Sequence, residues 1–296
     1  MSRQRWQGRL MWPVVALILC SCTCCFYICP KVWKQTEADM ELPAVGLDDL
    51  DVMTHNGDVV VEGTSASESI LVHVDIKAGG VDDLDARECL EAIMLETGVM
   101  GETQKLGWKW ATPRRKTWQA TVSFHVVLPS DMSVKVETHN GNVTLDAMRS
   151  MARLKTHNGN VNVRDHEGDL VGKTHNGDVK VDAEAPSLRL ETHNGGLDVV
   201  ARVEEVEIRT HNGSISTRLG GVAPLRGNVV THNGSVKLTL DEDVSTELVA
   251  TTNNGHISVH REMDMTVNKK KVVVATLGAG GGSLELETFN GSITVR

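Results

Sequence analysis

The stretch THNGNVTLDAMRSMARLKTHNGNVNVRDHEGDLVGKTHNGDVKV, residues 138–181, decides how this chain folds, because the tetrapeptide Thr-His-Asn-Gly returns in it every 18 residues. Outside this stretch, full copies begin at Thr54, Thr192, Thr210 and Thr231, and degenerate copies begin at Thr252 and Thr288. From residue 138 onward the spacings are 18, 18, 18, 18, 21, 21 and 36 residues. The last interval fits two units of 18, one of which has lost the tetrapeptide. A fixed period of this length is typical of repeat architectures.

The residues beside each tetrapeptide alternate between apolar and polar. Aliphatic residues stand two positions after each Gly, as at Val143 and Val161, and apolar residues recur two positions before most of the Thr residues, as at Val136 and Leu154. A period of two on both sides predicts that each unit is strand, Asn-Gly turn, strand, with Thr pointing inward and His outward. We expect positive φ angles at the turn. The turn-forming residues are Asn140, Gly141, Asn158, Gly159, Asn176, Gly177, Asn194, Gly195, Asn212, Gly213, Asn233 and Gly234.

Two architectures fit these units: a meander of hairpins, or a β-solenoid in which each unit is one coil and Asn-Gly marks a corner. Stacking identical coils about 4.8 Å apart pairs every strand edge except the terminal ones, which favours the solenoid. A thin aliphatic interior also explains why only 3% of the 296 residues are aromatic. The fold class is therefore predicted as all-β, a β-solenoid of 18–21-residue repeats, with Thr and Asn columns that can form hydrogen-bonded ladders.

Residues 1–34 are typical of an export or anchoring segment. Three arginines precede an uncharged run from Leu10 to Cys29, and this segment carries five cations and no acid. Leu19-Cys20-Ser21-Cys22 resembles a lipobox, which would make Cys22 the lipidated residue of a lipoprotein. An uncleaved signal anchor and a buried core helix are the alternatives. Five of the six cysteines lie in this apolar run without a nearby His, so neither a disulfide framework nor a zinc site is expected.

The remaining chain divides into three predicted parts. Residues 35–46 form a spacer, residues 47–132 form a β-rich cap with a helix over 82–97, and residues 133–296 form the repeats. The cap also contains a basic-aromatic patch, which could contact anionic lipid or glycan, or could be a solvated loop with packed indoles. This patch comprises Lys105, Trp108, Lys109, Trp110, Arg114, Arg115, Lys116 and Trp118.

The composition excludes some partners and chemistries. Residues 35–296 hold 25 cations and 39 acids, a net charge of −14, which argues against nucleic acid as a partner. Nucleophile-elbow and HExxH motifs are absent, and acids do not recur at the fixed offsets of a calcium roll. No catalytic residue and no cofactor is predicted, although a polysaccharide-active β-helix enzyme would use carboxylates on the outer face of its coils. The acids considered are Glu137, Asp146, Asp165, Asp169, Asp178, Asp182 and Glu191.

The histidines of the repeats should form an external column with rings about 4.8 Å apart. Neighbouring neutral imidazoles are good ligands for zinc, copper or nickel, so the column is either a row of weak metal or proton-sensing sites or a stack of turn-flanking side chains. No tight structural metal site is expected, because no fixed third or fourth ligand is evident. The column comprises His139, His157, His175, His193, His211 and His232.

The sequence resembles the DUF4097 family of bacterial adhesin-like proteins over about residues 47–296. The resemblance rests on Val126-Val127-Leu128-Pro129 followed by residues 134–138, on the Gly-[Asp/Asn/Ser]-[Val/Ile] steps, and on the Gly-rich residues 277–286 before Asn290-Gly291. The repeated His departs from the Ser-Gly turns common in that family. The resemblance implies a β-solenoid of the cell envelope, without catalytic residues that can be transferred.

Together these features predict a membrane-tethered, extracytoplasmic protein that acts as a non-enzymatic adhesin-like or structural module. The expected partners are the membrane, through the N-terminal segment, and an envelope protein or glycan. A sensory or regulatory role in envelope stress remains an alternative, as does the polysaccharide-active enzyme.

Overall fold

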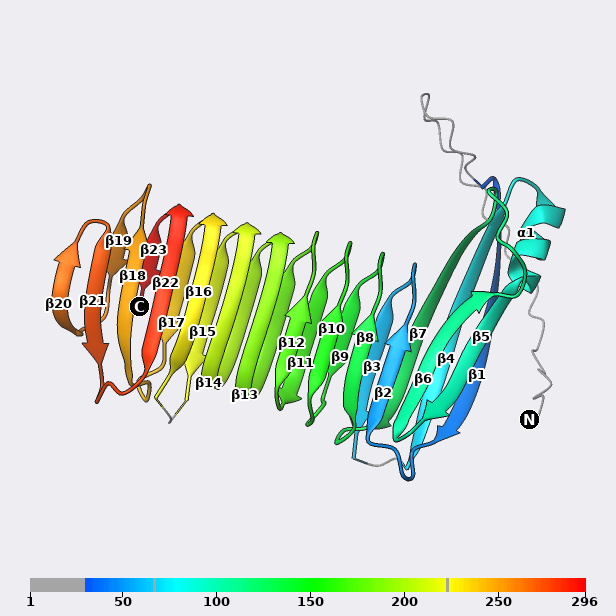
Figure 1. The fold of residues 1–296 in the computed structure, drawn as a ribbon, viewed down its shortest axis with the longest axis horizontal. Helices are drawn as coiled ribbons and strands as arrows, with labels where there is room; N and C mark the ends of the chain where they lie inside the picture. Colours follow the sequence, from blue (N-terminus) through cyan, green and yellow to red (C-terminus); the bar gives the residue numbers. More distant parts are fainter. Residues whose placement is uncertain (1–29, 66–67, 222–223) are drawn as a thin grey trace.

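The repeats stack as the coils of a long β-solenoid, with a cap at one end (Figure 1). The computed structural model describes residues 30–65, 68–221 and 224–296. Equivalent strands of successive coils pair in parallel and in register, so that Val161 lies beside Val179 and Val179 beside Leu197. The prediction of a β-solenoid is therefore confirmed. The predicted export segment and Cys22 lie outside the described residues, except for residues 30–34.

Each coil contributes one strand before the Thr-His-Asn-Gly corner and one strand after it. We call the sheet before the corners the leading face and the sheet after them the trailing face. The leading face contains β2 (Asp49–Met53), β8 (Ser133–Glu137), β10 (Ala152–Lys155), β12 (Leu170–Lys173), β16 (Arg226–Asn233), β18 (Thr246–Thr252) and β22 (Ser283–Asn290). The trailing face contains β3 (Val59–Thr64), β9 (Val143–Asp146), β11 (Val161–Glu167), β15 (Ile215–Gly220), β17 (Val236–Leu240), β19 (Ile257–Val259) and β23 (Ile293–Val295). Two long strands, β13 (Val179–Asn194) and β14 (Leu197–Asn212), begin on the trailing face and end on the leading face.

The core is a narrow aliphatic strip between the two faces. In the seven full tetrapeptide copies the aliphatic residues two positions after the corner glycines, such as Val143 and Val179, are buried, and Leu154 and Leu190 oppose them from the leading face. Burial alternates along the strands, as the period-two pattern predicts. Phe124 is the largest of the fully buried side chains, so a thin core suffices to hold the stack.

Both ends of the stack are assembled out of sequence order. The first coil, β2 and β3, pairs directly with β8 and β9, although most of the cap lies between them in the chain. At the far end, β22 and β23 lie between the coil of β16 and β17 and the coil of β18 and β19. The prediction that the 36-residue interval holds two coils is wrong. Part of that interval forms a hairpin of β20 (Asp264–Lys269) and β21 (Val272–Leu277), and β21 pairs antiparallel with β18.

The cap extends both faces beyond the first coil. On the trailing face β7 (Gln119–Pro129) pairs with β3, β4 (Ser69–Gly80) pairs with β7, and β1 (Val32–Pro43) pairs with β4. On the leading face β6 (Thr103–Trp110) pairs with β2, and β5 (Ile93–Met100) pairs with β6. The predicted spacer at 35–46 is therefore wrong for most of its length. Ala38, Met40 and Leu42 alternate there with acidic residues and pack against the core, while β4 supplies a continuous edge of backbone hydrogen-bonding groups.

Helix α1 (Asp83–Glu91) is shorter than the predicted helix over 82–97. Asp82 caps it as expected, since its carboxylate accepts a hydrogen bond from the backbone N–H of Asp85 at 2.8 Å. The second half of the prediction is wrong, because Ile93–Met100 forms β5 and satisfies its backbone groups on β6. α1 lies at the margin of the cap (Figure 1), where Cys89 and Ala92 pack with Ala78 and Trp118. Within the described ranges, no helix is long and apolar enough to cross a membrane.

Candidate interaction surfaces

The Thr of each corner is buried and ties its coil to the preceding one. Thr156 Oγ1 donates a hydrogen bond to the carbonyl of Gly141 at 2.8 Å, and Thr174 Oγ1 donates to Gly159 at 2.8 Å. The same bond recurs along the stack. The predicted inward orientation of Thr is confirmed. Its partner is a backbone carbonyl of the neighbouring coil, not another Thr.

The Asn residues form a continuous side-chain ladder at the surface. Each amide nitrogen donates to the amide oxygen of the neighbouring coil, for example Asn158 to Asn140 at 2.7 Å and Asn176 to Asn158 at 2.8 Å. The ladder runs through Asn56, Asn140, Asn158, Asn176, Asn194, Asn212, Asn233, Asn290 and Asn254. Each Asn within the ladder thus serves as both donor and acceptor, which fixes the register of the corners.

The corner glycines are required for a reason that differs from the predicted one. Among the glycines of the seven full Thr-His-Asn-Gly copies, only Gly57 has a φ angle in the left-handed region, at 146°. In the later coils a Cβ would lie 1.9–2.0 Å from the carbonyl oxygen of the glycine in the neighbouring coil. The positions concerned are Gly141, Gly159, Gly177, Gly195, Gly213 and Gly234. Stacking between coils, rather than the φ angle of the turn, therefore excludes a side chain here.

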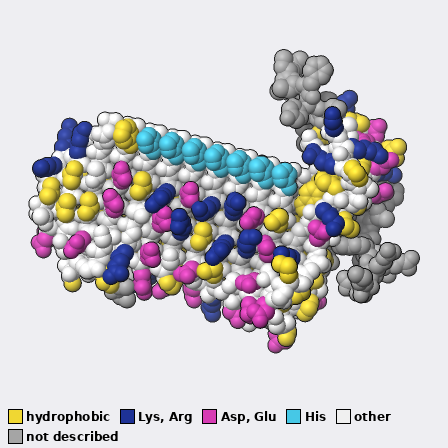
Figure 2. Space-filling view, viewed as in Figure 1, with side chains coloured by type: hydrophobic (Ala, Val, Ile, Leu, Met, Phe, Trp, Pro, Cys, Tyr) yellow, Lys and Arg dark blue, Asp and Glu magenta, His cyan; other side chains and the backbone are white. Residues whose placement is uncertain are grey.

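The histidines form an unbroken column along one edge of the stack (Figure 2). Adjacent ring centroids are 4.7–4.9 Å apart, and the ring planes are within 3° of parallel. Two members fall outside the predicted set: His55 starts the column, and Phe289 ends it by stacking on His232 at 4.9 Å. We call these eight rings the His column. Both additional members occupy the His position of their tetrapeptides, at Thr54 and Thr288, so the sequence already contained the signal.

The stacked geometry affects how the column can bind protons and metals. Burial and neighbouring rings lower the pKa of His55 and His157 below the usual value. The lone pair of an imidazole nitrogen lies in the plane of its ring. In a stack of parallel rings these lone pairs therefore run parallel to one another and do not converge on one metal ion. In the described part of the chain, no group of three or more His, Cys, Asp and Glu could hold a metal ion. Binding of one ion by several rings would require them to rotate out of the stack.

A shallow groove runs beside the His column on the leading face. Two hollows of about 480 and 420 Å³ follow one another along it, bounded by the corner Thr and His residues. The opposite side is formed by the residue before each Thr, which is most often charged: Glu137, Lys155, Lys173, Glu191, Arg209 and Glu287. Lys173 and Glu191 form an ion pair at 2.8 Å. The groove therefore presents a regular row of charges of both signs.

Three of the candidate catalytic carboxylates make contacts between neighbouring coils. A general acid needs a raised pKa, but Glu191 has a lowered pKa because Lys173 donates a hydrogen bond to it. Asp178 accepts the backbone N–H of Gly196 at 2.8 Å, and Asp169 accepts that of Ser187 at 3.1 Å. These carboxylates bind neighbouring coils to one another, which is a structural role.

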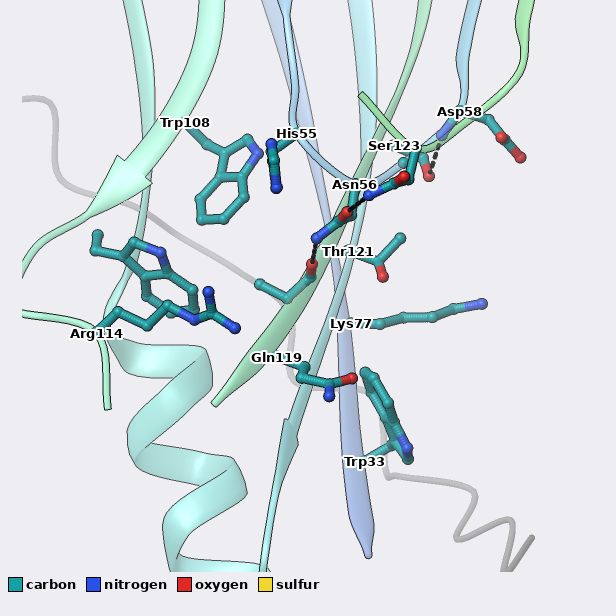
Figure 3. A pocket seen from close by; sticks show the side chains of 14 residues that line it. Trp33, His55, Asn56, Asp58, Lys77, Trp108, Arg114, Gln119, Thr121 and Ser123 are labelled. Atoms are coloured by element: carbon teal, nitrogen blue, oxygen red, sulfur yellow. Dashed lines mark hydrogen bonds between the residues drawn. The ribbon is translucent and has the colours of Figure 1, made fainter. Parts of the chain in front are cut away.

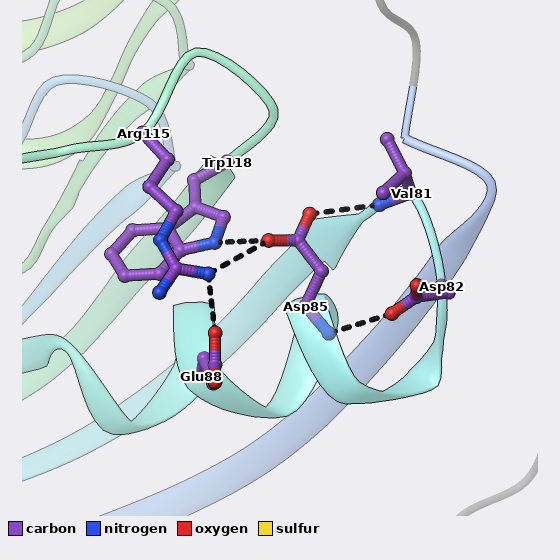
Figure 4. Close-up of polar contacts among 6 residues, drawn as sticks. All are labelled: Val81, Asp82, Asp85, Glu88, Arg115 and Trp118. Carbon is purple, nitrogen blue, oxygen red and sulfur yellow. Dashed lines mark hydrogen bonds and ion pairs between the residues drawn. The ribbon is translucent and has the colours of Figure 1, made fainter.

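Two residues of the predicted basic-aromatic patch, Arg115 and Trp118, stabilise the cap (Figure 4). Trp118 is buried and donates from Nε1 to Asp85 at 2.8 Å, while Arg115 lies 4.8 Å from the Trp118 ring and pairs with Glu88. Asp85 also accepts the backbone N–H of Val81 at 3.0 Å. These contacts bind the β6–β7 loop to α1. Three further members of the patch, Trp108, Trp110 and Arg114, lie with the first corner in the lining of one pocket.

The fold and its corner columns define a parallel β-solenoid closed at one end by a β-rich cap. The model of the family described as Toastrack DUF4097 matches residues 114–296, more than half of the chain, and the chain belongs to this family. The resemblance inferred from the sequence is thus confirmed. No curated protein matches the chain in sequence.

Two solved structures illustrate the similarity. A candidate adhesin from Bacteroides fragilis NCTC 9343 is 12% identical, with a TM-score of 0.50, over 89% of this chain and 97% of that one. A candidate lipid binding protein from Parabacteroides distasonis ATCC 8503 is 12% identical, with a TM-score of 0.46, over 88% of this chain and 96% of that one. At this level of identity, the first similarity establishes a shared fold.

Proposed function

We propose that this protein is a membrane-tethered, extracytoplasmic interaction module without enzymatic activity. The N-terminal segment, with its basic residues, apolar run and lipobox-like Leu19-Cys20-Ser21-Cys22, supports the tether. The structural neighbour described as a candidate adhesin is consistent with this role. An envelope protein or a glycan is the partner class that we propose, and the acidic body disfavours nucleic acid.

The main observation behind this proposal is the groove beside the His column. It keeps the same form from coil to coil, because each coil places His, Thr and one further side chain at the same register. Parallel pairing, the Asn ladder and the Thr bonds hold these positions rigidly. A rigid groove of constant form suits an extended partner and loses little conformational entropy on binding. The lowered pKa of Glu191 within it suits ion pairing and not proton transfer.

Labelling of intact cells tests the location. Ser216 is exposed on β15 of the trailing face, and a Ser216→Cys variant offers a thiol there. A membrane-impermeant maleimide should label this variant in intact spheroplasts more strongly than the parent chain, whose own cysteines provide the background. If the additional label enters only after lysis, the extracytoplasmic location is wrong.

Binding to purified cell-wall material tests the interaction and the absence of catalysis together. We expect the full chain to be retained without release of reducing ends. Lys155→Glu reverses a charge in the groove and should weaken retention, whereas Lys237→Glu reverses an exposed charge on the trailing face and should not. Release of reducing ends would refute the non-enzymatic role. Equal behaviour of the two variants would refute the groove as the binding surface.

A further inference from the structure

A separate pocket lies where the first corner meets the cap, on the trailing side of the His column (Figure 3). Its volume is about 520 Å³. Trp108 and Arg114 lie on one side of a polar centre, and Trp33 and Lys77 lie on the other. This combination of aromatic faces and cations is not part of the groove on which the proposed function rests.

One side of the pocket is built by the register of the cap strands. Trp33 of β1 lies opposite Gly79 of β4, which in turn lies opposite Gln119 of β7. A Cβ on Gly79 would lie 3.1 Å from Cε3 of Trp33, so glycine leaves room for the indole to lie close to the sheet. Trp33 remains 43% exposed. Two residue pairs further along, Lys77 lies opposite Thr121, so an ammonium group and a hydroxyl follow the indole on the same face.

The other side of the pocket is a braced row of indoles. Trp108 donates from Nε1 to Thr54 Oγ1 at 3.1 Å, which fixes it to the first corner. Trp110 lies edge-on to Trp108 with centroids 5.3 Å apart, and Trp118 follows at 5.8 Å from Trp110. Because Trp118 is held by Asp85, the row is fixed at both ends. A preorganised aromatic wall loses little rotamer entropy when a ligand binds.

The charges in the pocket favour an anion. Arg114 is oriented by a hydrogen bond from its Nε to the Trp118 carbonyl at 3.0 Å. Among the ion pairs of the described residues, the neighbouring Arg115 binds Glu88, whereas neither Arg114 nor Lys77 has a carboxylate partner. Asp58 is the one acidic residue of the lining, and its carboxylate already accepts the backbone N–H of Asn142 at 2.7 Å.

We propose that this pocket binds a short acidic saccharide, whose neighbouring sugar rings each carry a carboxylate. One ring would pack on Trp33 and the next on Trp108, which lie on opposite sides of the pocket, since indoles offer large rigid apolar surfaces with a polar edge. Gln119 and Thr121 would exchange hydrogen bonds with ring hydroxyls. Lys77 would pair with the carboxylate of one ring and Arg114 with that of the next, since the two cations lie on opposite sides of the pocket and a carboxylate accepts strong charge-assisted bonds. The lining combines three indoles with polar and charged side chains, which suits a ligand that offers both apolar ring faces and hydroxyl groups.

Calorimetric titration of the full chain in detergent with digalacturonate tests this assignment. Neutral galactobiose serves as the comparison ligand. We expect digalacturonate to bind, galactobiose to bind at least tenfold more weakly, and Lys77→Gln to weaken digalacturonate binding at least tenfold. Lys180→Gln removes an exposed charge from the trailing face and should leave binding unchanged. Trp33→Ala should weaken the binding of both sugars.

Several results would overturn the assignment. One is the absence of digalacturonate binding at millimolar concentration. Another is an equal loss of affinity in Lys77→Gln and Lys180→Gln. A third is unchanged sugar binding by a Trp33→Ala variant that melts like the wild type. Inorganic phosphate or phosphatidylglycerol vesicles that bind as tightly as digalacturonate would also overturn it, because the site would then recognise phosphate. The test does not involve Lys155, so this site and the groove can fail independently.

Discussion

Replacing Gly177 by Ala should show how tightly the coils are stacked. A Cβ at this position would lie 2.0 Å from the carbonyl oxygen and 2.6 Å from the carbonyl carbon of Gly159. Nonbonded heavy atoms attract best at about 3.5–4.0 Å, so the two corners would have to separate by at least about 1 Å. Both clashing atoms belong to the backbone, so no side-chain rotation can relieve the contact.

The cost follows from the hydrogen bonds that join these two corners. Separation would weaken the Thr174 Oγ1 bond to Gly159, the Asn176 N–H bond to His157 and the Asn176 Nδ2 bond to Asn158, each 2.8 Å long. At a net contribution of about 1 kcal/mol for each bond, the loss should be about 3 kcal/mol. The damage should be greatest in adjacent coils, because coils contact only their neighbours.

Gly196→Ala is the matched control, one residue beyond the next corner glycine. Its Cβ would lie 3.4 Å from the Ser214 carbonyl oxygen and 3.7 Å from Asp178 Oδ1, which are ordinary contacts. Urea unfolding followed by circular dichroism should show a clearly lower midpoint for Gly177→Ala, and hydrogen exchange should place the loss near residue 177. Gly196→Ala should stay within about 0.5 kcal/mol of the parent. If both variants unfold like the parent, the close carbonyl contact does not explain the glycine.

Three further predictions concern the His column and the cap. Stability should fall as the pH drops below about 6.5, because the pKa values of His55 and His157 are lower in the folded protein than in the unfolded chain, which therefore binds protons first. His157→Phe retains a stacked ring, so it should reduce the fall in urea midpoint between pH 7.5 and 5.0. Burial raises the pKa of Cys89 to about 11, so peptide mass spectrometry should find its alkylation at pH 8 at least tenfold slower in the native protein than in urea. Asp85→Asn removes the charge that holds Trp118 and should lower stability by about 2 kcal/mol, whereas Glu91→Gln, an exposed change on the same helix, should not; equal urea midpoints would contradict this.

Local pattern was sufficient to predict the coils. Each repeat shows the period-two alternation of apolar and polar residues by itself. This period predicts the strands, the inward orientation of Thr and the outward orientation of His. The Asn ladder and the stacked rings follow from identical side chains at one register. These features need only the assumption that equal units stack, which is why the sequence revealed most of the His column and of the turn residues.

The failures arise where distant segments decide the outcome. Residues 35–43 form β1: Ala38, Met40 and Leu42 alternate there with acidic residues, as in a strand, but the pattern does not show that β4 is the partner. Ile93–Met100 becomes a strand because β6 lies beside it. Asp165 adopts a left-handed φ of 46° at a bulge in β11, which turns His166 into the core. Trp33 and Trp108 line the same pocket only because the strand order of the cap brings β1 and β6 to it. No local signal in any of these segments specifies its partner.

The placement of β22 and β23 inside the stack has a consequence for synthesis. As the chain emerges from the ribosome or an export channel, the coils from residue 133 to residue 240 can dock one after another. The coil of β18 and β19 is made next. β18 can pair with β21 on one edge, but on its other edge it has no coil to dock on until residues 283–295 have emerged. Until then β16 and β18 both present open edges, which are sites for proteolysis and for pairing with other chains. The far end of the stack can therefore close, with β22 and β23 between the two coils, only after translation has passed residue 295.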